Sequence, residues 1–313
     1  MLSKIPFINK IPLKIIKYLV VVTFFVVLAY FPIGMIIAHN ISDDVEFSVD
    51  EGFFVEGGSN AVSMTVSLID REINKNSWVA NNPWFMPSSY IDNMPNFQNG
   101  IVYAASRFVI EMGDQIGRTR GSSQIDEDLN EAVSRIKYSG DIWVWQPSVS
   151  ILPQMPSESQ YNQAIKHLEG YNQRLANGEA VFDKRADNLL QTLERISGDL
   201  GSSSASIDGH RHNGFFDTKA DDIFYQTKGR MYAYYLILKS LGEDFQDVLE
   251  EKNAVKVWDE ALVSMRKAAE LRPTVVTAGT PDAMFIANHL NTIGFYLLRS
   301  RTQLKEVSSI LAK

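Results

Sequence analysis

The stretch from Tyr18 to Ala38 constrains this chain more than any other part, because its 21 residues include no charged side chain. As a helix with a rise of about 1.5 Å per residue it would be roughly 31 Å long. That length matches a bilayer hydrocarbon core of roughly 30 Å. A single segment in lipid must satisfy its backbone hydrogen bonds internally, which leaves a helix as the expected form. The sequence therefore predicts a transmembrane anchor over residues 18–38, with the lipid bilayer as its partner.

The charges on the two sides of the anchor have opposite signs. The side chains before it are basic (Lys4, Lys10, Lys14 and Lys17), and those directly after it are acidic, beginning with Asp43 and Asp44. Basic flanks stay on the cytoplasmic side of a membrane. We therefore expect a cytoplasmic basic segment at 1–17 and a chain that lies outside the cytoplasm from about residue 39 onward.

A cleaved secretory signal is the competing interpretation of the same stretch. Such signals usually have an apolar segment of about 7–15 residues that ends at a small-x-small site. Here the apolar run is longer, and its best candidate ending, Ile36-Ile37-Ala38, has a bulky residue where a small one is needed. The pattern favours an uncleaved signal anchor.

Composition limits the classes of function. The chain has 30 Lys+Arg against 37 Asp+Glu, and setting aside the four lysines before the anchor leaves 26 against 37. A surface with this excess of acid repels nucleic acid, so we expect no nucleic-acid partner. The chain has no cysteine, which excludes disulfides, thiol catalysis and a Cys-ligated metal site.

Beyond a juxtamembrane linker at 39–60, apolar periodicity and capping residues predict a mostly α fold, a multi-helix bundle over 61–313. Helices are expected at about 61–74, 97–118, 124–138, 158–176, 179–200, 217–241, 245–271 and 281–312. The helix at 179–200 is expected to be the antiparallel partner of 158–176. Residues 201–214, GSSSASIDGHRHNG, are low in complexity. They are interpreted as a linker and a possible boundary within the bundle.

Two long segments are too irregular for regular elements and too aromatic for disordered linkers, at 75–98 and 140–156. We expect ordered loops that pack on the bundle. Three interpretations stay open: a lid folded onto the core, a recognition surface of the kind that carries binding hot spots, or contact with the outer leaflet of the membrane. The large side chains concerned are Trp78, Trp84, Phe85, Met86, Tyr90, Trp143 and Trp145.

Several blocks of sequence, in order along the chain, resemble a bacterial family of membrane-anchored proteins known as domain of unknown function 2333. These blocks include YIDNMPNFQNGIV (90–102), RTRGSSQIDEDL (118–129), PSESQYNQAIKHLEGYNQRL (156–175) and DDIFYQTKGRMYAYYLIL (221–238). The resemblance implies one N-terminal anchor and a helical domain outside the cytoplasm, which in a bacterium is the periplasm. It implies no established activity.

Acidic residues are the candidates for catalysis. Asp221 and Asp222 stand at an expected helix start, where carboxylates are favoured by the helix dipole. Together with Asp92 they are interpreted as possible acid/base groups. The competing interpretation is simple capping with an intrahelical ion pair.

Two other clusters invite a ligand. Arg118 and Arg120 precede a Gly-Ser turn and could bind a phosphate or carboxylate, although arginines also suit a helix C-terminus. His210 and His212 are weak candidates for a metal site, and the favoured interpretation is two solvated histidines with no metal. No cofactor is expected. The predicted binding residues are Trp84, Tyr90, Asp92, Asn93, Trp143, Arg118 and Arg120.

The favoured hypothesis is a non-enzymatic protein of the bacterial inner membrane. Its periplasmic helical domain would serve as a scaffold or interaction module for an envelope protein partner. The alternative is a hydrolase or lyase acting on an envelope polymer through paired carboxylates, which requires at least two of them to converge. A third hypothesis is a solute-sensing bundle with a pocket beside Arg118 and Arg120.

Overall fold

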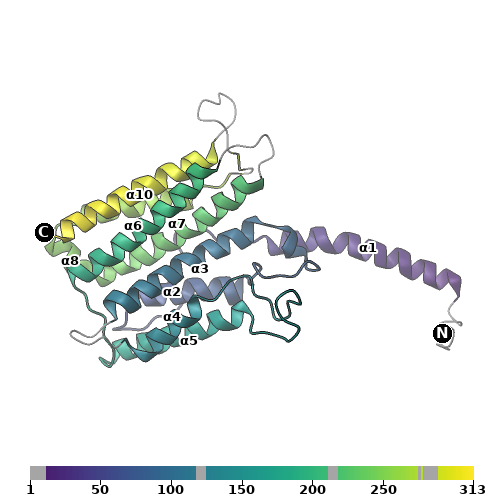
Figure 1. Cartoon of the computed structure of the whole chain (residues 1–313), viewed down its shortest axis with the longest axis horizontal. Coiled ribbons are helices and arrows are strands. Elements are labelled where there is room, and N and C mark those ends of the chain that lie inside the picture. Colours follow the sequence, from purple (N-terminus) through teal and green to yellow (C-terminus); the bar gives the residue numbers. More distant parts are fainter. Residues whose placement is uncertain (1–11, 118–124, 211–217, 274–275, 278–287) are drawn as a thin grey trace.

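The computed structural model describes residues 12–117, 125–210, 218–273, 276–277 and 288–313 (Figure 1). Within these ranges it contains ten α-helices and no β-strand. This confirms the predicted mostly α fold, in which one N-terminal apolar helix precedes a helical bundle.

Helix α1 (Leu13–Ala38) projects away from the bundle, as Figure 1 shows. By length and composition it is long and apolar enough to cross a membrane, and none of its apolar window is buried inside the protein. Most of its large side chains are exposed. Its last two turns contact a short 3₁₀ turn, η3 (Pro87–Tyr90).

The bundle is formed by the remaining nine helices. They are α2 (Asn60–Asp70), α3 (Asn93–Glu111), α4 (Glu127–Ile136), α5 (Ser157–Ala176), α6 (Ala186–Gly209), α7 (Thr218–Asp244), α8 (Gln246–Glu251), α9 (Val255–Ala269) and α10 (His289–Leu311). Two of them, α2 and α3, continue into π-helical turns at η2 (Arg71–Lys75) and η4 (Met112–Ile116).

Helix α7 is the centre of the bundle. It packs against α2, α3, α9 and α10, and its residues 231–238 are all buried. A helix that is apolar around its whole circumference is stable only when it is covered on every side. The run MYAYYLIL at 231–238 therefore belongs at the core.

Helices α3 and α7 run in the same direction at close contact. Asn96 donates to Asp222 at 2.6 Å, and two turns further along both helices the Arg230 guanidinium lies 3.9 Å from the centre of the Tyr103 ring. A Cβ atom on Gly229 would lie 2.2 Å from the Phe97 carbonyl oxygen. The close contact therefore needs glycine there, and it places the N-termini of both helices at one end of the bundle.

The segment between α1 and α2 is bonded to the bundle through buried charges. The Asp43 carboxylate pairs with the ammonium of Lys228 on α7, which is 2 % exposed. Arg272 Nη2 lies 2.7 Å from the Asp43 Oδ1 atom, and the Tyr232 hydroxyl donates to the Asp44 carbonyl at 2.8 Å. A buried charge is tolerated when it is paired and hydrogen-bonded in this way. The predicted linker is therefore a docked segment that ties α1 to the core.

Two predictions about α6 were wrong. Residues 201–209 of the predicted linker are helical and belong to α6, because Ser203 and Ile207 are buried against neighbouring helices. The Ser203 hydroxyl accepts from the Arg230 guanidinium at 2.7 Å. Residues 211–214 lie outside the described residues, and the possible boundary at 201–214 stays a prediction.

The predicted pairing of α6 with α5 was also wrong, since α6 packs mainly on α10 while α5 packs on α4 and α2. A non-helical connection precedes α6 at Ala186, and the backbone N–H of Asp183 donates to the Ile116 carbonyl at 2.9 Å. This connection takes the chain across the bundle. The predicted helix at 245–271 is divided into α8 and α9 at Asn253, where φ is +55°.

We predict that Asp43→Asn lowers the free energy of unfolding by about 3–5 kcal/mol at neutral pH, because it leaves the buried Lys228 ammonium without its partner. Burial acts to raise the pKa of Asp43, but the hydrogen bonds and charges of Arg272 and Lys228 outweigh burial and lower that pKa. A carboxyl with a lowered folded-state pKa stabilises the fold above its unfolded-state pKa, and this stabilisation is lost as pH falls through the folded-state value. Urea unfolding in detergent, followed by circular dichroism, measures the difference.

Asp44→Asn is the matched control, because the Asp44 side chain is exposed and, among the described residues, accepts a hydrogen bond only from the backbone N–H of Glu46, at 3.0 Å. It should change the stability by less than about 0.5 kcal/mol. The deficit of Asp43→Asn should shrink below about pH 4. Equal effects of the two substitutions, or a deficit that does not depend on pH, would contradict this account.

Candidate functional site

The two aromatic loops predicted from the sequence form one assembly. The Trp78 indole N–H donates to the Gly140 carbonyl at 2.8 Å, and the Asn81 amide donates to the Ile142 carbonyl at 2.8 Å. The rings of Phe85 and Trp143 meet edge to face, with centroids 5.6 Å apart. These contacts join segments that are about 60 residues apart in the sequence.

The rings differ in burial. Trp78 is a core residue, 3 % exposed, and packs edge to face on Tyr161. In contrast, Trp84 is 76 % exposed and Tyr90 is 60 % exposed, while Trp143 is half-buried. The lid interpretation therefore applies to Trp78, and the remaining rings form a surface.

This surface adjoins the end of α1. The rings of Tyr90 and Phe31 meet edge to face, with centroids 5.3 Å apart. A Cβ atom on Gly34 would lie 2.4 Å from Pro87 Cγ, so η3 lies directly against the helix at that glycine. The surface is thus continuous with the helix that could enter a membrane.

The three acidic candidates converge. One carboxylate oxygen from each of Asp92, Asp221 and Asp222 lies within 4.8 Å of the other two. Asp92 precedes the first residue of α3, Asp221 belongs to the first turn of α7, and Asp222 directly follows that turn. The parallel packing of α3 and α7 therefore brings together residues that are almost 130 positions apart.

Burial and mutual repulsion change how this cluster titrates. Burial, followed by the charges of Asp92 and Asp222, raises the pKa of Asp221. Burial and the charge of Asp92 also raise the pKa of Asp222, against the hydrogen bond that Asn96 donates. Carboxylates with raised pKa values can act as general acids, and three convergent oxygens are also a geometry suited to a divalent cation.

Among the other predicted polar site residues, the structure describes Asn93 and His210, and no hydrogen bond is described from either of them to the three carboxylates. Asn93 is the first residue of α3, and its Oδ1 atom is shielded from solvent without a hydrogen-bond partner among the described residues. His210 directly follows α6. Arg118, Arg120 and His212 lie outside the described residues, so the predicted anion site and histidine pair stay predictions.

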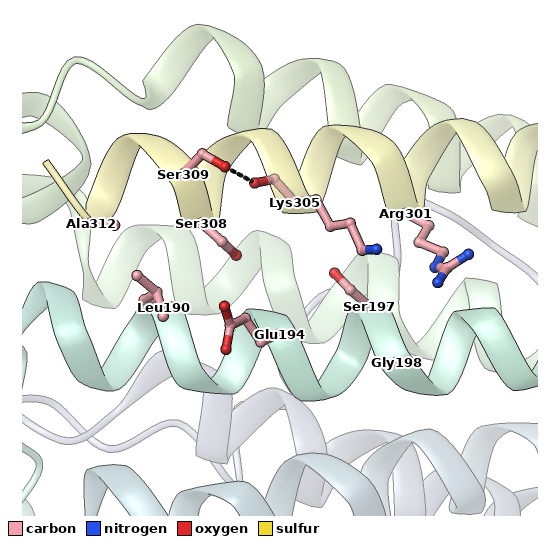
Figure 2. A pocket seen from close by; sticks show the side chains of 9 residues that line it. All are labelled: Leu190, Glu194, Ser197, Gly198, Arg301, Lys305, Ser308, Ser309 and Ala312. Carbon is pink, nitrogen blue, oxygen red and sulfur yellow. Dashed lines mark hydrogen bonds between the residues drawn. The ribbon is translucent and has the colours of Figure 1, made fainter.

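A groove of about 520 Å³ is lined by residues of α6 and α10, along the line where the two helices pack (Figure 2). Figure 2 shows Arg301 and Lys305 of α10 facing Ser197 and Glu194 of α6. The Arg301 Nε and Ser197 Oγ atoms are shielded from solvent and are thus out of reach of a ligand in the groove. The cationic groups that remain accessible face the Glu194 carboxylate, and none of the predicted site residues that the structure describes lines this groove.

The comparison with known families matches nearly the whole chain. The model of the family DUF2333, described as an uncharacterised protein conserved in bacteria, matches residues 10–213 and 212–313. The chain belongs to this family. No curated protein and no solved structure matches it. Membership of DUF2333 confirms the resemblance inferred from the sequence and identifies a bacterial protein, but it assigns no activity.

Sequence reasoning missed several residues of the aromatic surface. Large side chains beyond the predicted rings are exposed on the second loop (Val144, Val149, Ile151, Leu152 and Met155). One signal was available in the sequence. Residues 76–91 and 142–157 contain no charged side chain, which is unusual for exposed loops of an acidic protein.

We predict that Trp78→Ala lowers the free energy of unfolding by about 3–5 kcal/mol, because it empties a buried ring position and leaves the Gly140 carbonyl without its donor. Trp84→Ala, in the same loop, should change stability by less than about 0.5 kcal/mol, because that ring contributes to a surface. Thermal unfolding in detergent measures both. A large loss from Trp84→Ala would mean that the exposed rings belong to the core and would remove the surface as a binding site.

Proposed function

We propose that this DUF2333 protein is a single-pass protein of the bacterial inner membrane that uses its helical bundle as an interaction module, or scaffold, in the periplasm. The N-terminus lies in the cytoplasm, α1 is an uncleaved signal anchor, and the bundle is on the outer side. The acidic surface of the bundle is available to an envelope partner.

One observation carries this proposal. An exposed aromatic surface lies at the end of the bundle where α1 emerges, with Tyr90 packed edge to face on Phe31. Exposed apolar patches of this kind mark surfaces of interaction. The docked segment with Asp43 fixes the bundle on the anchor, so the surface has one orientation relative to α1.

The charge pattern supports the direction of insertion. Lys14 and Lys17 are the nearest charged residues before the apolar run, whereas Asp43 and Asp44 are the nearest after it. Lysines near the end of a transmembrane helix favour the cytoplasmic side.

Thiol labelling of intact spheroplasts tests this topology directly, because the chain has no cysteine of its own. Val255→Cys, at the exposed start of α9, should react with a membrane-impermeant maleimide in intact spheroplasts. Ser3→Cys should react only after the membrane is opened. Cross-linking in intact cells, followed by purification through the C-terminus, should return a discrete envelope protein.

The reverse labelling pattern would place the bundle in the cytoplasm and overturn the proposal. A mature polypeptide that begins near His39 would identify a cleaved signal and overturn the anchor. Total thiol labelling after denaturation is the control for the amount of protein. A denatured sample without label at either position contains no protein.

The convergence of three carboxylates favours one alternative, a hydrolase or lyase that acts on an envelope polymer. Asp221 and Asp222 have raised pKa values and lie within reach of Asp92. In such an enzyme one carboxyl group donates a proton to the leaving group while a second carboxylate at close spacing attacks the substrate as the nucleophile, and water then releases the product from that carboxylate. The cluster supplies the pair that this chemistry needs.

If the alternative holds, the purified chain should release soluble fragments from isolated envelope polymer, and Asp222→Asn should reduce the rate by about 100-fold or more. Asp208→Asn, on the exposed side of α6, is the matched control and should leave the rate unchanged. Chromatography of the released fragments measures the rate. No release by the unmodified chain across the acidic and neutral pH range would exclude the alternative.

A further inference from the structure

We propose that the partner of the exposed aromatic surface is the phospholipid of the bilayer that α1 crosses, and that the two loops lie at the boundary between the headgroups and the acyl chains of its outer leaflet. This inference rests on the proposed function, because it requires α1 to be a membrane anchor. It assigns phospholipid as the ligand class of the exposed aromatic surface.

The first argument is depth. Phe31 and Gly34, which contact η3, precede the last residue of α1 by seven and four positions. At about 1.5 Å per residue these contacts lie roughly 10 Å and 6 Å before the end of the helix. The apolar run just spans a hydrocarbon core of roughly 30 Å. Interfacial segments lie about 5–10 Å into the boundary between headgroups and acyl chains. The contacts with η3 therefore lie at interfacial depth.

The second argument is chemistry. Many exposed side chains of the two loops are large and apolar, and Ile151 and Leu152 of the second loop are 88 % and 74 % exposed. The loops also carry Trp84, Tyr90 and Trp145, the residue types that gather where membrane meets water. No charged residue lies between Lys75 and Asp92 or between Asp141 and Glu158. The two loops themselves therefore exert no acidic repulsion on anionic headgroups, and the carboxylates at this end of the bundle (Asp92, Asp221 and Asp222) lie outside them.

The third argument is that the loop backbone next to α1 is satisfied internally. Around η3 the backbone N–H groups of Met86, Ser89 and Ile91 donate to the carbonyls of Pro83, Met86 and Ser88, at 2.9, 3.1 and 3.3 Å. Pro87 has no N–H group to satisfy. A segment that enters a region poor in water must pair its own polar groups, and this turn does so.

The fourth argument is rigidity. The two loops are bonded to each other through Trp78 and Asn81, and the bundle is held on α1 by the buried Asp43 carboxylate. The loops therefore cannot move away from the membrane without breaking buried contacts. In Figure 1, α8 and the C-terminus lie at the opposite end of the bundle from α1.

Site-directed spin labelling of the full chain tests the proposal, using vesicles of phosphatidylethanolamine and phosphatidylglycerol. Single cysteines replace Trp84, Ile151, Ile33 on the exposed face of α1, and Val255 at the far end of the bundle. Nitroxides in lipid collide with oxygen and lose collisions with a water-soluble nickel chelate. Labels at 84 and 151 are expected to lose most of their nickel collisions, approaching the label at 33, while the label at 255 remains fully accessible.

Nickel accessibility at 84 and 151 equal to that at 255, with the label at 33 shielded, would overturn this inference and leave the surface to a protein partner. If the label at 33 is also accessible, α1 does not enter lipid and the proposed function fails as well. The double substitution Ile151→Asp/Leu152→Asp provides a second measurement. It should restore nickel collisions at 84, whereas Val255→Asp should not.

Discussion

The charge pairing of Asp43 with Lys228 and Arg272 is the interaction on which the arrangement of the molecule depends. Asp43 stands five residues after the end of α1, and Lys228 belongs to the buried central helix α7. Lys228 also donates to the Leu271 carbonyl at 2.7 Å, so one ammonium group joins the anchor segment to the chain after α9. Because a buried ammonium without a partner is strongly destabilising, this joint keeps the bundle in a fixed position on α1.

Because the bundle is fixed on α1, the aromatic loops can contact only partners that lie near the end of that helix. On a flexible tether, Trp84 and Tyr90 could turn toward any partner in the periplasm. Held as they are, with Tyr90 against Phe31, they can meet only what surrounds the end of α1. Under the proposed topology that is lipid or another membrane-embedded segment. Under the same topology, α8 and the C-terminus lie at the end of the bundle that is farther from the bilayer (Figure 1).

Local patterns were sufficient to predict α1, the mostly α fold and the existence of two ordered aromatic loops, because each depends on nearby residues. The grouping of Asp92 with Asp221 and Asp222 was proposed only from residue type, and the structure explains it by the close parallel contact at Gly229. Residues 201–209 could not be identified as helix from their composition. Their helical form depends on Ile207 and Ser203 being buried by α10 and α7, which are tertiary contacts that override weak propensity. The role of Asp43 could not be predicted from the sequence for the same reason, since its partners Lys228 and Arg272 lie 185 and 229 positions away.

The position of the carboxylate cluster links the two candidate functions. Asp92 follows Tyr90 by two residues, so the cluster lies next to the turn that contacts α1. The N-termini of α3 and α7 both point their positive dipole ends at it, which favours negative charge there, while burial and mutual repulsion raise the pKa values of Asp221 and Asp222. A proton or a cation shared among the three groups would relieve that repulsion. Under the proposed topology, any chemistry carried out by these carboxylates would take place at the membrane surface, on a substrate that reaches the outer leaflet.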